Sequence, residues 1–356
     1  MSIGIVGTVG YPSNYGGFET LVKYLVEEKP ENTEVRVYCE SICKSYNFDI
    51  KDSISRIFTP FKANGWQSIL YDCLSIIHSV RVNEKTLILG SSGGLVMLFR
   101  LFFKKHQFIV NIGGLDWQRD KWSYFPQVVL RWSESLVIRN ANVIISDNEA
   151  IKEYIVETYG RDSILIAYGG DQAVKEQIDE NDKQKYLFLR EQFIFTLARI
   201  QKDNNIELII QAYLELPNRR MPLVIIGNWK SSIYGLELRK KYSVAPSVYL
   251  LDAIYDQQEL NKIRGRARLY VHGHSAGGTN PALVEAMNLN LNIICFDSVY
   301  NRYTTENKAK YFSNSTELSE LMDDRSRTEN GNVMKTIANS RYKWSLVINS
   351  YYNLFK

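Results

Sequence analysis

The residues best suited to chemistry lie in the segment His272–Met287, whose sequence is HGHSAGGTNPALVEAM. A short apolar run, Leu269–His272, precedes a loop that contains several glycines. Asn280 and Pro281 follow the loop; asparagine is a favoured N-cap, and proline is a favoured first residue of a helix. This order of residue types predicts a strand, a loop and then a helix that begins at Pro281.

The first turn of this predicted helix offers two kinds of contact to a ligand. Backbone N–H groups at the start of a helix can hold a phosphate, and those of Leu283 and Val284 are candidates. Glu285 lies one turn into the helix among apolar neighbours, where its carboxylate has no evident structural role. We therefore expect Glu285 to point to a ligand, where it could accept hydrogen bonds from two ribose hydroxyl groups.

Two cations follow another predicted strand, Phe193–Ala198. Arg199 and Lys202 stand between this strand and a predicted helix over Asn205–Leu216. Guanidinium and ammonium groups bind phosphate oxygens through charge-assisted hydrogen bonds. We expect both side chains to bind a diphosphate; the alternative is ordinary salt bridging at the surface.

A third candidate site is the loop that follows the first predicted strand. The glycines at positions 4, 7 and 10 have the spacing G-x-x-G-x-x-G, which is not the G-x-G-x-x-G turn that binds dinucleotides. The loop ends at Gly16 and Gly17, immediately before a predicted helix over Phe18–Glu28. Their N–H groups and the helix dipole could receive a phosphate. The alternative is a flexible loop in which the glycines only allow turning.

A fourth candidate segment, residues 113–122, follows the predicted strand Phe108–Ile112. A glycine there would permit close approach of a substrate, and a carboxylate could do acid/base or hydroxyl-binding work. Cations could meet a phosphate, and tryptophans could stack on a sugar. The alternative is a helix start at which the carboxylate only caps the helix. The residues concerned are Gly114, Asp116, Trp117, Arg119, Lys121 and Trp122.

These segments need a scaffold of alternating strands and helices, and the whole chain alternates in this way. Short β-branched or apolar runs are followed by longer helical patterns, which is typical of βαβ units with a parallel sheet. The pattern starts again after a polar stretch, Asp171–Lys185, which we expect to be a linker. The sequence therefore predicts an α/β protein with two Rossmann-like domains. A final helix with a broad apolar face is expected over Tyr342–Phe355.

Length and composition narrow the class of protein. The 356 residues fit two domains, and the net charge of +4 is too small to suggest a nucleic-acid partner. The four cysteines form no disulfide framework, and no metal-ligand cluster is visible. The chain begins with a predicted strand rather than a signal peptide. We therefore expect a cytoplasmic protein without an essential metal or other cofactor.

One stretch could contact a membrane surface. Residues 100–139 contain seven Lys or Arg against three acidic residues. The apolar run Leu95–Phe103, which is too short to cross a bilayer, is followed by Lys104, Lys105 and His106. These residues could form an interfacial helix on an anionic membrane, making the protein peripheral. The alternative is a buried helix with a basic end on a solvated face.

The sequence resembles family 4 of the nucleotide-sugar glycosyltransferases, and within it the bacterial rhamnosyltransferase subgroup of cell-surface polysaccharide and O-antigen synthesis. The resemblance implies the GT-B fold, which has two facing Rossmann-like domains, a cleft between them and a C-terminal helix that crosses back to the first domain. It implies an acceptor-binding domain over residues 1–172, a nucleotide-sugar-binding domain over 186–335 and the crossing helix over 336–356. The matching stretches are Gly10–Glu19, Gly114–Trp122, Arg199–Glu207, His272–Met287 and the tryptophan-bearing C-terminal helix.

The resemblance also implies a reaction and roles for residues. A hexose, L-rhamnose from dTDP-L-rhamnose by this resemblance, would be transferred with retention of configuration to a lipid-linked saccharide at the inner membrane face. The leaving diphosphate would help to deprotonate the acceptor. Donor contacts would come from Gly16, Gly17, Arg199, Lys202, Ala253, Ile254, Asn280, Leu283, Val284 and Glu285. Catalytic roles would fall to Arg199, Lys202 and Asp116, and acceptor contacts to Gly114, Asp116, Trp117, Arg119 and Trp122.

Three positions depart from the family's pattern. The family's glutamate eight residues before Glu285 is replaced by Gly277, and its lysine five residues after Arg199 is replaced by Asn204. An acidic residue or histidine that often ends the Phe108–Ile112 strand is replaced by Gly113. Three rival functions stay open at this point. The first is a sugar-nucleotide epimerase of the same fold, and the second is a nicotinamide-dependent oxidoreductase, which the glycine spacing disfavours. The third is a sugar-nucleotide-binding regulatory subunit without activity, which the missing carboxylate at Gly277 keeps open.

Overall fold

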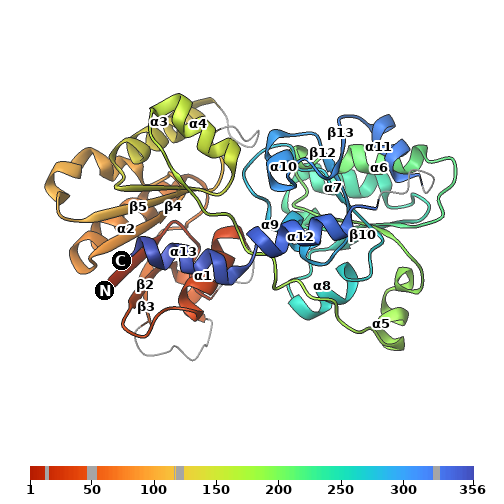
Figure 1. The fold of residues 1–356 in the computed structure, drawn as a ribbon, viewed down its shortest axis with the longest axis horizontal. Coiled ribbons are helices and arrows are strands. Elements are labelled where there is room, and N and C mark those ends of the chain that lie inside the picture. The colour runs from red at the N-terminus through yellow and green to blue at the C-terminus, as the bar shows by residue number, and fades with distance from the viewer. Residues whose placement is uncertain (13–15, 46–53, 116, 118–123, 324–328) are drawn as a thin grey trace. The chain divides into compact units, whose positions relative to one another are not determined.

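The computed structural model describes residues 1–12, 16–45, 54–115, 117, 124–323 and 329–356 (Figure 1). The chain forms two compact units. Unit 1 contains Met1–Tyr168 together with Ser345–Lys356, and unit 2 contains Gly169–Trp344. The stretch over which the sequence suggests a linker, 171–185, belongs to unit 2.

Unit 1 is built around a parallel sheet with the strand order β3-β2-β1-β4-β5-β6-β7. Its strands are β1 (Ser2–Val6), β2 (Glu34–Glu40), β3 (Ile54–Thr59), β4 (Lys85–Leu89), β5 (Gln107–Ile112), β6 (Val143–Ser146) and β7 (Ile164–Leu165). Its helices are α1 (Gly17–Glu27), α2 (Ser68–Val82), α3 (Tyr124–Asn140), α4 (Glu149–Tyr159) and most of α13 (Trp344–Leu354), with 3-10 segments η1 (Ser41–Ser45), η2 (Gly65–Gln67) and η3 (Gly94–Phe103).

Unit 2 repeats this architecture with the strand order β10-β9-β8-β11-β12-β13. Its strands are β8 (Ile194–Leu197), β9 (Leu223–Gly227), β10 (Val248–Asp252), β11 (Leu269–His272), β12 (Asn292–Phe296) and β13 (Lys310–Phe312). Its helices are α5 (Glu180–Lys185), α6 (Ile206–Glu215), α7 (Ile233–Tyr242), α8 (Gln257–Arg264), α9 (Pro281–Asn288), α10 (Val299–Thr304), α11 (Ser315–Met322) and α12 (Gly331–Arg341), with 3-10 segments η5 (Leu187–Arg190), η6 (Lys202–Asn204) and η7 (Trp229–Ser231).

Every strand pair in both sheets is parallel, as the alternation of strands and helices predicts. In each sheet the strand order reverses direction at one place: between β1 and β4 in unit 1, and between β8 and β11 in unit 2. Ligands of such sheets bind outside the carboxyl ends of the strands at this switch point. The loops that follow β1, β4, β8 and β11 are therefore the places to look for a site.

The C-terminal helix α13 returns the chain to unit 1, where it lies alongside α1 (Figure 1). Tyr352 Oη donates to the carbonyl oxygen of Leu25 in α1 at 2.5 Å. Lys85 Nζ donates to the carbonyl oxygen of Phe355 at 2.6 Å, and Asn111 Nδ2 donates to Tyr351 Oη. These bonds and the buried apolar side chains of α13 hold the helix on the first unit, as the family resemblance implies.

Candidate functional site

The loops that follow β8 and β11 are bonded to each other at the switch point of unit 2. Asn205 Nδ2 donates to the carbonyl oxygen of Gly273 at 2.8 Å, and the Ser275 amide donates to the carbonyl oxygen of Asp203 at 2.9 Å. Asn205 adopts a left-handed conformation with φ 51°, which asparagine tolerates better than most residues. The two loops therefore form one connected polar surface at the carboxyl edge of the sheet.

Arg199 and Lys202 both lie on this surface. Their side chains are exposed, and Lys202 begins the 3-10 segment η6. Asn204 Nδ2 donates to the carbonyl oxygen of Arg199 at 3.0 Å, which fixes the backbone that carries the guanidinium. Two exposed cations on a loop at the switch point can attract and bind a diphosphate.

The amino end of α9 borders the same loops. Asn280 is its N-cap, since Oδ1 accepts from the Ala282 amide at 3.0 Å, and Pro281 is the first helical residue. The expectation that the amides of Leu283 and Val284 are open to phosphate is wrong. Both donate to the carbonyl oxygen of Asn280, at 3.1 and 3.3 Å, because the first turn closes on its own cap, and both side chains are fully buried.

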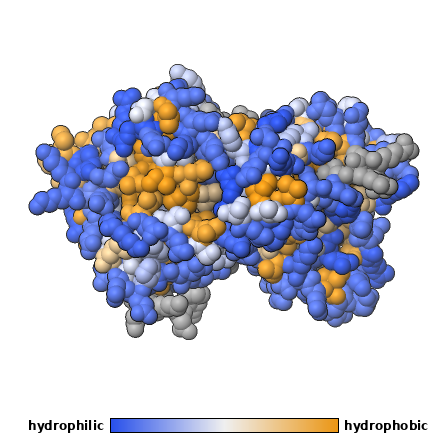
Figure 2. Space-filling view, in the orientation of Figure 1, coloured by the Kyte–Doolittle hydropathy of each residue, from blue (hydrophilic) through white to orange (hydrophobic). Residues whose placement is uncertain are grey.

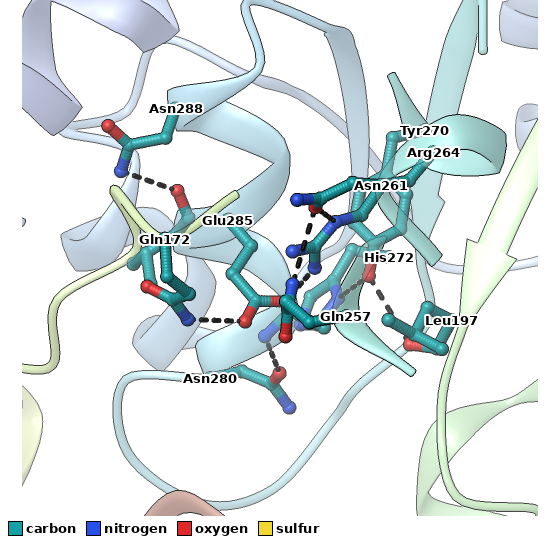
Figure 3. Close-up of polar contacts among 12 residues, drawn as sticks. Gln172, Leu197, Gln257, Asn261, Arg264, Tyr270, His272, Asn280, Glu285 and Asn288 are labelled. Atoms are coloured by element: carbon teal, nitrogen blue, oxygen red, sulfur yellow. Dashed lines mark hydrogen bonds and ion pairs between the residues drawn. The ribbon is translucent and has the colours of Figure 1, made fainter. Parts of the chain in front are cut away.

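Glu285 is half-buried and lies between Gln172 and Arg264 in unit 2 (Figure 3). Its Oε2 is 2.5 Å from Arg264 Nη1, and its Oε1 accepts from Gln172 Nε2 at 2.6 Å. The Arg264 side chain is only 2% exposed, whereas the Glu285 side chain is 14% exposed. The expectation that Glu285 has no structural partner is therefore wrong. The positive charge of the buried Arg264 side chain is balanced by the negative charge of the Glu285 carboxylate. The carboxylate still reaches the surface, so it can also meet a ligand.

The partners of Glu285 were missed by sequence reasoning. Arg264 ends α8, where an arginine is expected simply to complement the helix dipole. Instead its Nε donates to Asn261 Oδ1 at 2.9 Å, and its Nη2 is buried without a hydrogen-bond partner among the described residues. Gln172 Oε1 accepts from Trp344 Nε1 at 2.7 Å. Glu285 is thus held by side chains distant in sequence, and no local signal could have identified them.

Ala253 and Ile254 follow β10, two strands away from β8 in the same sheet. Both are half-buried, and they occupy the loop that leads to α8. The end of β10 is tied to the neighbouring loop, because Trp229 Nε1 donates to the carbonyl oxygen of Leu251 at 2.8 Å. This loop therefore lies at the same edge of the sheet as Arg199.

In unit 1 the loop after β1, which was expected to bind a phosphate, is bonded to a carboxylate of α1. Gly16 caps α1 with φ 130°, a conformation that favours glycine. The carboxylate of Glu19 turns back to the loop and accepts from Thr8 Oγ1 and the Val9 amide, both at 3.2 Å. The amino end of α1 at Gly16 and Gly17 thus already faces a carboxylate, which would oppose a phosphate placed there.

The segment after β5 is described only in part. Asp116, Arg119, Lys121 and Trp122 lie outside the described residues. Gly113 packs against Phe18, and a Cβ on it would lie 2.9 Å from Phe18 Cζ, which explains why a larger residue is absent there. Gly114 has φ 149°. The Arg131 guanidinium lies 5.0 Å from the centre of the Trp117 ring, so a cation already covers part of this aromatic surface.

Two other features bear on the class of site. In the described parts of the chain, no group of three His, Cys, Asp or Glu side chains is placed to bind a metal ion. That the protein needs no metal for activity stays a prediction. Among the helices that the structure describes, none combines the length and the apolar character needed to cross a bilayer.

Family models match both halves of the chain. Residues 1–171 match a domain of unknown function (DUF1972), and residues 177–325 match glycosyl transferases group 1. An uncharacterized glycosyltransferase of Methanocaldococcus jannaschii is 24% identical over 311 residues, which cover 78% of this chain and 76% of that protein.

Solved structures share the fold over almost the whole chain. Sucrose-phosphate synthase of Thermosynechococcus elongatus superposes with a TM-score of 0.81 at 14% identity, covering 99% of this chain and 98% of that one. Anabaena HepE, solved in complex with UDP and glucose, superposes with a TM-score of 0.76 at 13% identity, covering 100% and 99%. These similarities confirm the predicted GT-B fold.

Proposed function

We propose that this chain, which is a glycosyltransferase of group 1, transfers a hexose from a nucleoside diphosphate donor with retention of anomeric configuration. The observation that carries the proposal is the pair of exposed cations, Arg199 and Lys202, on the loop after β8 at the switch point of unit 2. A diphosphate is the part of such a donor that needs two cations. The sugar and the base of the donor then bind to the loops on either side.

The proposed chemistry relies on charge stabilisation rather than on an enzymic nucleophile. The bond between the anomeric carbon and the diphosphate oxygen breaks, and a bond from that carbon to the acceptor oxygen forms on the same face. The acceptor's hydroxyl proton passes to the leaving diphosphate. Arg199 and Lys202 stabilise the negative charge that develops on the diphosphate, which lowers the barrier. We propose that Asp116 helps to orient the acceptor hydroxyl.

We assign the nucleoside to the loops on either side of these cations. Glu285 accepts hydrogen bonds from ribose hydroxyl groups, in an orientation set by Arg264 and Gln172. The backbone of Ala253 and Ile254 meets the base. A carboxylate that is fixed by two partners before the donor arrives loses little entropy on binding, which favours affinity.

The first candidate donor is dTDP-L-rhamnose, because the sequence resembles the rhamnosyltransferase subgroup. A UDP-hexose is the second candidate, because HepE, which has the same fold, was solved with UDP and glucose. The acceptor is a lipid-linked saccharide of a cell-surface polysaccharide or O-antigen pathway. Gly114, Trp117, Arg119 and Trp122 in unit 1 are the proposed acceptor contacts.

A lipid-linked acceptor requires approach to a membrane, and the surface of η3 supports this. Leu98, Phe99, Leu101 and Phe102 are between 54% and 81% exposed. At the left edge of unit 1 in Figure 2, apolar side chains reach the surface. η3 consists of 3-10 turns interrupted at Phe99, not the regular helix expected, but it presents the apolar face that an interfacial segment needs.

Lysines supply exposed positive charge next to this apolar surface. Lys104 and Lys105 are exposed, and they complement anionic lipid headgroups. His106, expected to add charge, is buried and 2.8 Å from Thr86 Oγ1. Burial lowers the pKa of His106 to about 4, so the ring is neutral at physiological pH. We therefore place the protein in the cytoplasm, peripheral on the inner face of the membrane, with its contact surface at residues 98–105.

Vesicle flotation tests this surface. The protein should float with vesicles that contain anionic lipid, and Phe102→Asp together with Leu101→Asp should abolish flotation. Leu236→Asp, at an exposed apolar residue in unit 2, is the matched control and should float normally. Flotation of the double variant equal to that of the wild type would rule out this contact surface.

The activity itself is tested by the release of nucleoside diphosphate. The purified protein is incubated with a panel that includes dTDP-L-rhamnose and UDP-glucose, with and without a membrane lipid extract. Release that requires both one donor and the lipid extract supports transfer and names the donor. Release with no dependence on the extract would instead indicate that water takes the place of the acceptor and hydrolyses the donor, and the proposal of a lipid-linked acceptor would fail.

A further inference from the structure

The side chain of Trp344, the tryptophan of the C-terminal helix, is held in one place by its surroundings. Trp344 is the first residue of α13 and the last residue of unit 2. Its backbone amide donates to Asp171 Oδ1 at 2.9 Å. The indole lies against Gly169, because a Cβ on that glycine would lie 2.5 Å from Trp344 Cγ. Trp344 is only 3% exposed, so packing fixes the direction of its Nε1–H group.

Gln172 connects this indole to the carboxylate of Glu285, as its bond to the carboxylate in Figure 3 shows. Gln172 Oε1 accepts from Trp344 Nε1 at 2.7 Å, and Gln172 Nε2 donates to Glu285 Oε1 at 2.6 Å. An indole nitrogen can only donate and a carboxylate can only accept, so the two partners determine which way the amide points. An amide suits this position, because it offers an acceptor to the indole and a donor to the carboxylate.

The backbone that leads to this glutamine is tied to α9, the helix that carries the carboxylate. A Cβ on Gly170 would lie 2.7 Å from the carbonyl carbon of Val284, so a glycine is needed for this close approach to the helix. The Gly170 amide donates to the carbonyl oxygen of Tyr342 at 2.9 Å. Segment 169–172 is therefore in contact with both α9 and residues 342–344.

The carboxylate of Glu285 keeps lone pairs for a ligand, and its two partners set their direction. Oε1 accepts from Gln172 and Oε2 accepts from Arg264, whereas each carboxylate oxygen has two lone pairs. Arg264 is buried, so its side of the carboxylate is fixed by packing. Gln172 is half-buried, and its bond to the indole of Trp344 restrains the rotation of its amide.

We infer that Trp344 is a positioning residue of the donor site: through Gln172 it sets the orientation in which Glu285 accepts hydrogen bonds from the ribose. The inference rests on the ribose contact proposed above. It gives the tryptophan of the C-terminal helix a role besides packing, because the indole N–H group fixes the amide and the amide fixes the carboxylate. Trp344 acts through Gln172 and does not itself bind the donor.

The test compares ligands that differ only in the hydroxyl groups of the ribose. Dissociation constants are measured by calorimetry for UDP and its dideoxy analogue, and for dTDP and its dideoxy analogue. Because hydrogen bonds to charged groups are strong, the wild type should prefer the ligand with hydroxyl groups by about 10-fold or more. Trp344→Phe keeps an aromatic ring against Gly169 but removes the N–H group. It should reduce this preference by about 2- to 10-fold and leave the affinity for the dideoxy analogue unchanged.

Two further variants separate this role from a purely structural one. Gln172→Met should reduce the preference at least as much, and adding Trp344→Phe to it should reduce the preference no further, because the indole acts through the amide. Trp229→Phe is the matched control, since it removes another indole bond in unit 2, from Trp229 Nε1 to the carbonyl oxygen of Leu251 at 2.8 Å. It should lower the melting temperature but leave the preference unchanged. An unchanged preference in Trp344→Phe, or an equal reduction in Trp229→Phe, would overturn the inference.

The inference and the donor site fail in different ways. If the double variant Glu285→Leu with Arg264→Met loses the preference while Trp344→Phe keeps it, the ribose contact stands and the role of Trp344 is refuted. If the wild type binds each ligand and its dideoxy analogue equally, the ribose contact of Glu285 is wrong, and the inference falls with it. If the wild type binds none of these ligands, the donor site itself is wrong.

Discussion

Replacing Glu285 by alanine should destabilise unit 2 far more than the loss of a surface acid would. The change leaves the guanidinium of Arg264, whose side chain is 2% exposed, without its countercharge at 2.5 Å. Removing one partner of a buried ion pair typically costs about 3–5 kcal/mol, because the other charge stays buried and unpaired. For a unit of this size, about 2–4 °C is lost per kcal/mol, so the melting temperature should fall by about 6–20 °C.

The design separates the structural role of the pair from donor binding. In the double variant Glu285→Leu with Arg264→Met, both charges are removed, and most of the lost stability should return. Nucleotide-sugar affinity should stay low in this variant, because the proposed ribose acceptor is gone. The matched control is Glu259→Ala, which breaks a 2.5 Å pair with Lys185 whose side chains are 30% and 60% exposed. Losing this exposed pair should lower the free energy of unfolding by less than about 1 kcal/mol.

Thermal unfolding followed by calorimetry and urea unfolding followed by circular dichroism provide the two stability measures. The reasoning is refuted if Glu285→Ala unfolds within about 1 kcal/mol of the wild type, since a buried unpaired arginine cannot be that well tolerated. It is also refuted if the double variant is less stable than Glu285→Ala. Normal donor affinity in the double variant would remove Glu285 from the proposed ribose contact while leaving its structural role intact.

Three further results are expected. Gly277→Glu, which restores the carboxylate of the family, should lower the rate of transfer rather than raise it, and should cost about 1–3 kcal/mol in urea unfolding, because φ is 122° and His274 fills the space. Burial raises the pKa of Asp72 to about 7, so the folded state keeps a proton that the unfolded chain releases near pH 4. The free energy of unfolding should therefore fall by about 1.4 kcal/mol per pH unit from pH 4 to 7 relative to Asp72→Asn, and equal slopes in the two proteins would contradict this. Transfer should continue at an unchanged rate in EDTA, since we expect no essential metal; a loss of activity that Mg²⁺ reverses would show the opposite.

Much of the fold follows from local sequence patterns. The alternation of apolar runs with helical periods predicts two parallel sheets, and Asn280-Pro281 predicts the start of α9 at the correct residue. These features depend on neighbouring residues only. Short strands at sheet edges were not predicted: β7 has two residues and β13 has three, which is too few for a periodic pattern. β3 has six residues, but it was missed because Ser55 and Arg56 interrupt its apolar residues.

The site was predicted less completely, because its important contacts join residues far apart in the chain. The pairing of Glu285 with Arg264 and Gln172 depends on how α8 and α9 pack in unit 2. The bond between His274 and Asn204 crosses 70 residues. The amides of Leu283 and Val284 were expected to be open because a helix start usually leaves such donors unpaired, but here the Asn280 carbonyl takes both. Sequence alone indicates which loops meet, and the structure indicates which atoms remain for a ligand.

The most direct test of the central claim is the turnover of Arg199→Ala, measured as donor-dependent release of nucleoside diphosphate with the lipid extract present. If Arg199 stabilises the leaving diphosphate, its loss should raise the barrier by about 2.7–4 kcal/mol and lower turnover by about 100-fold or more, while the melting temperature stays unchanged. Lys240→Ala, at an exposed cation on α7, is the control and should turn over normally. Near-normal turnover of Arg199→Ala would contradict the account, because the diphosphate would then have to bind elsewhere.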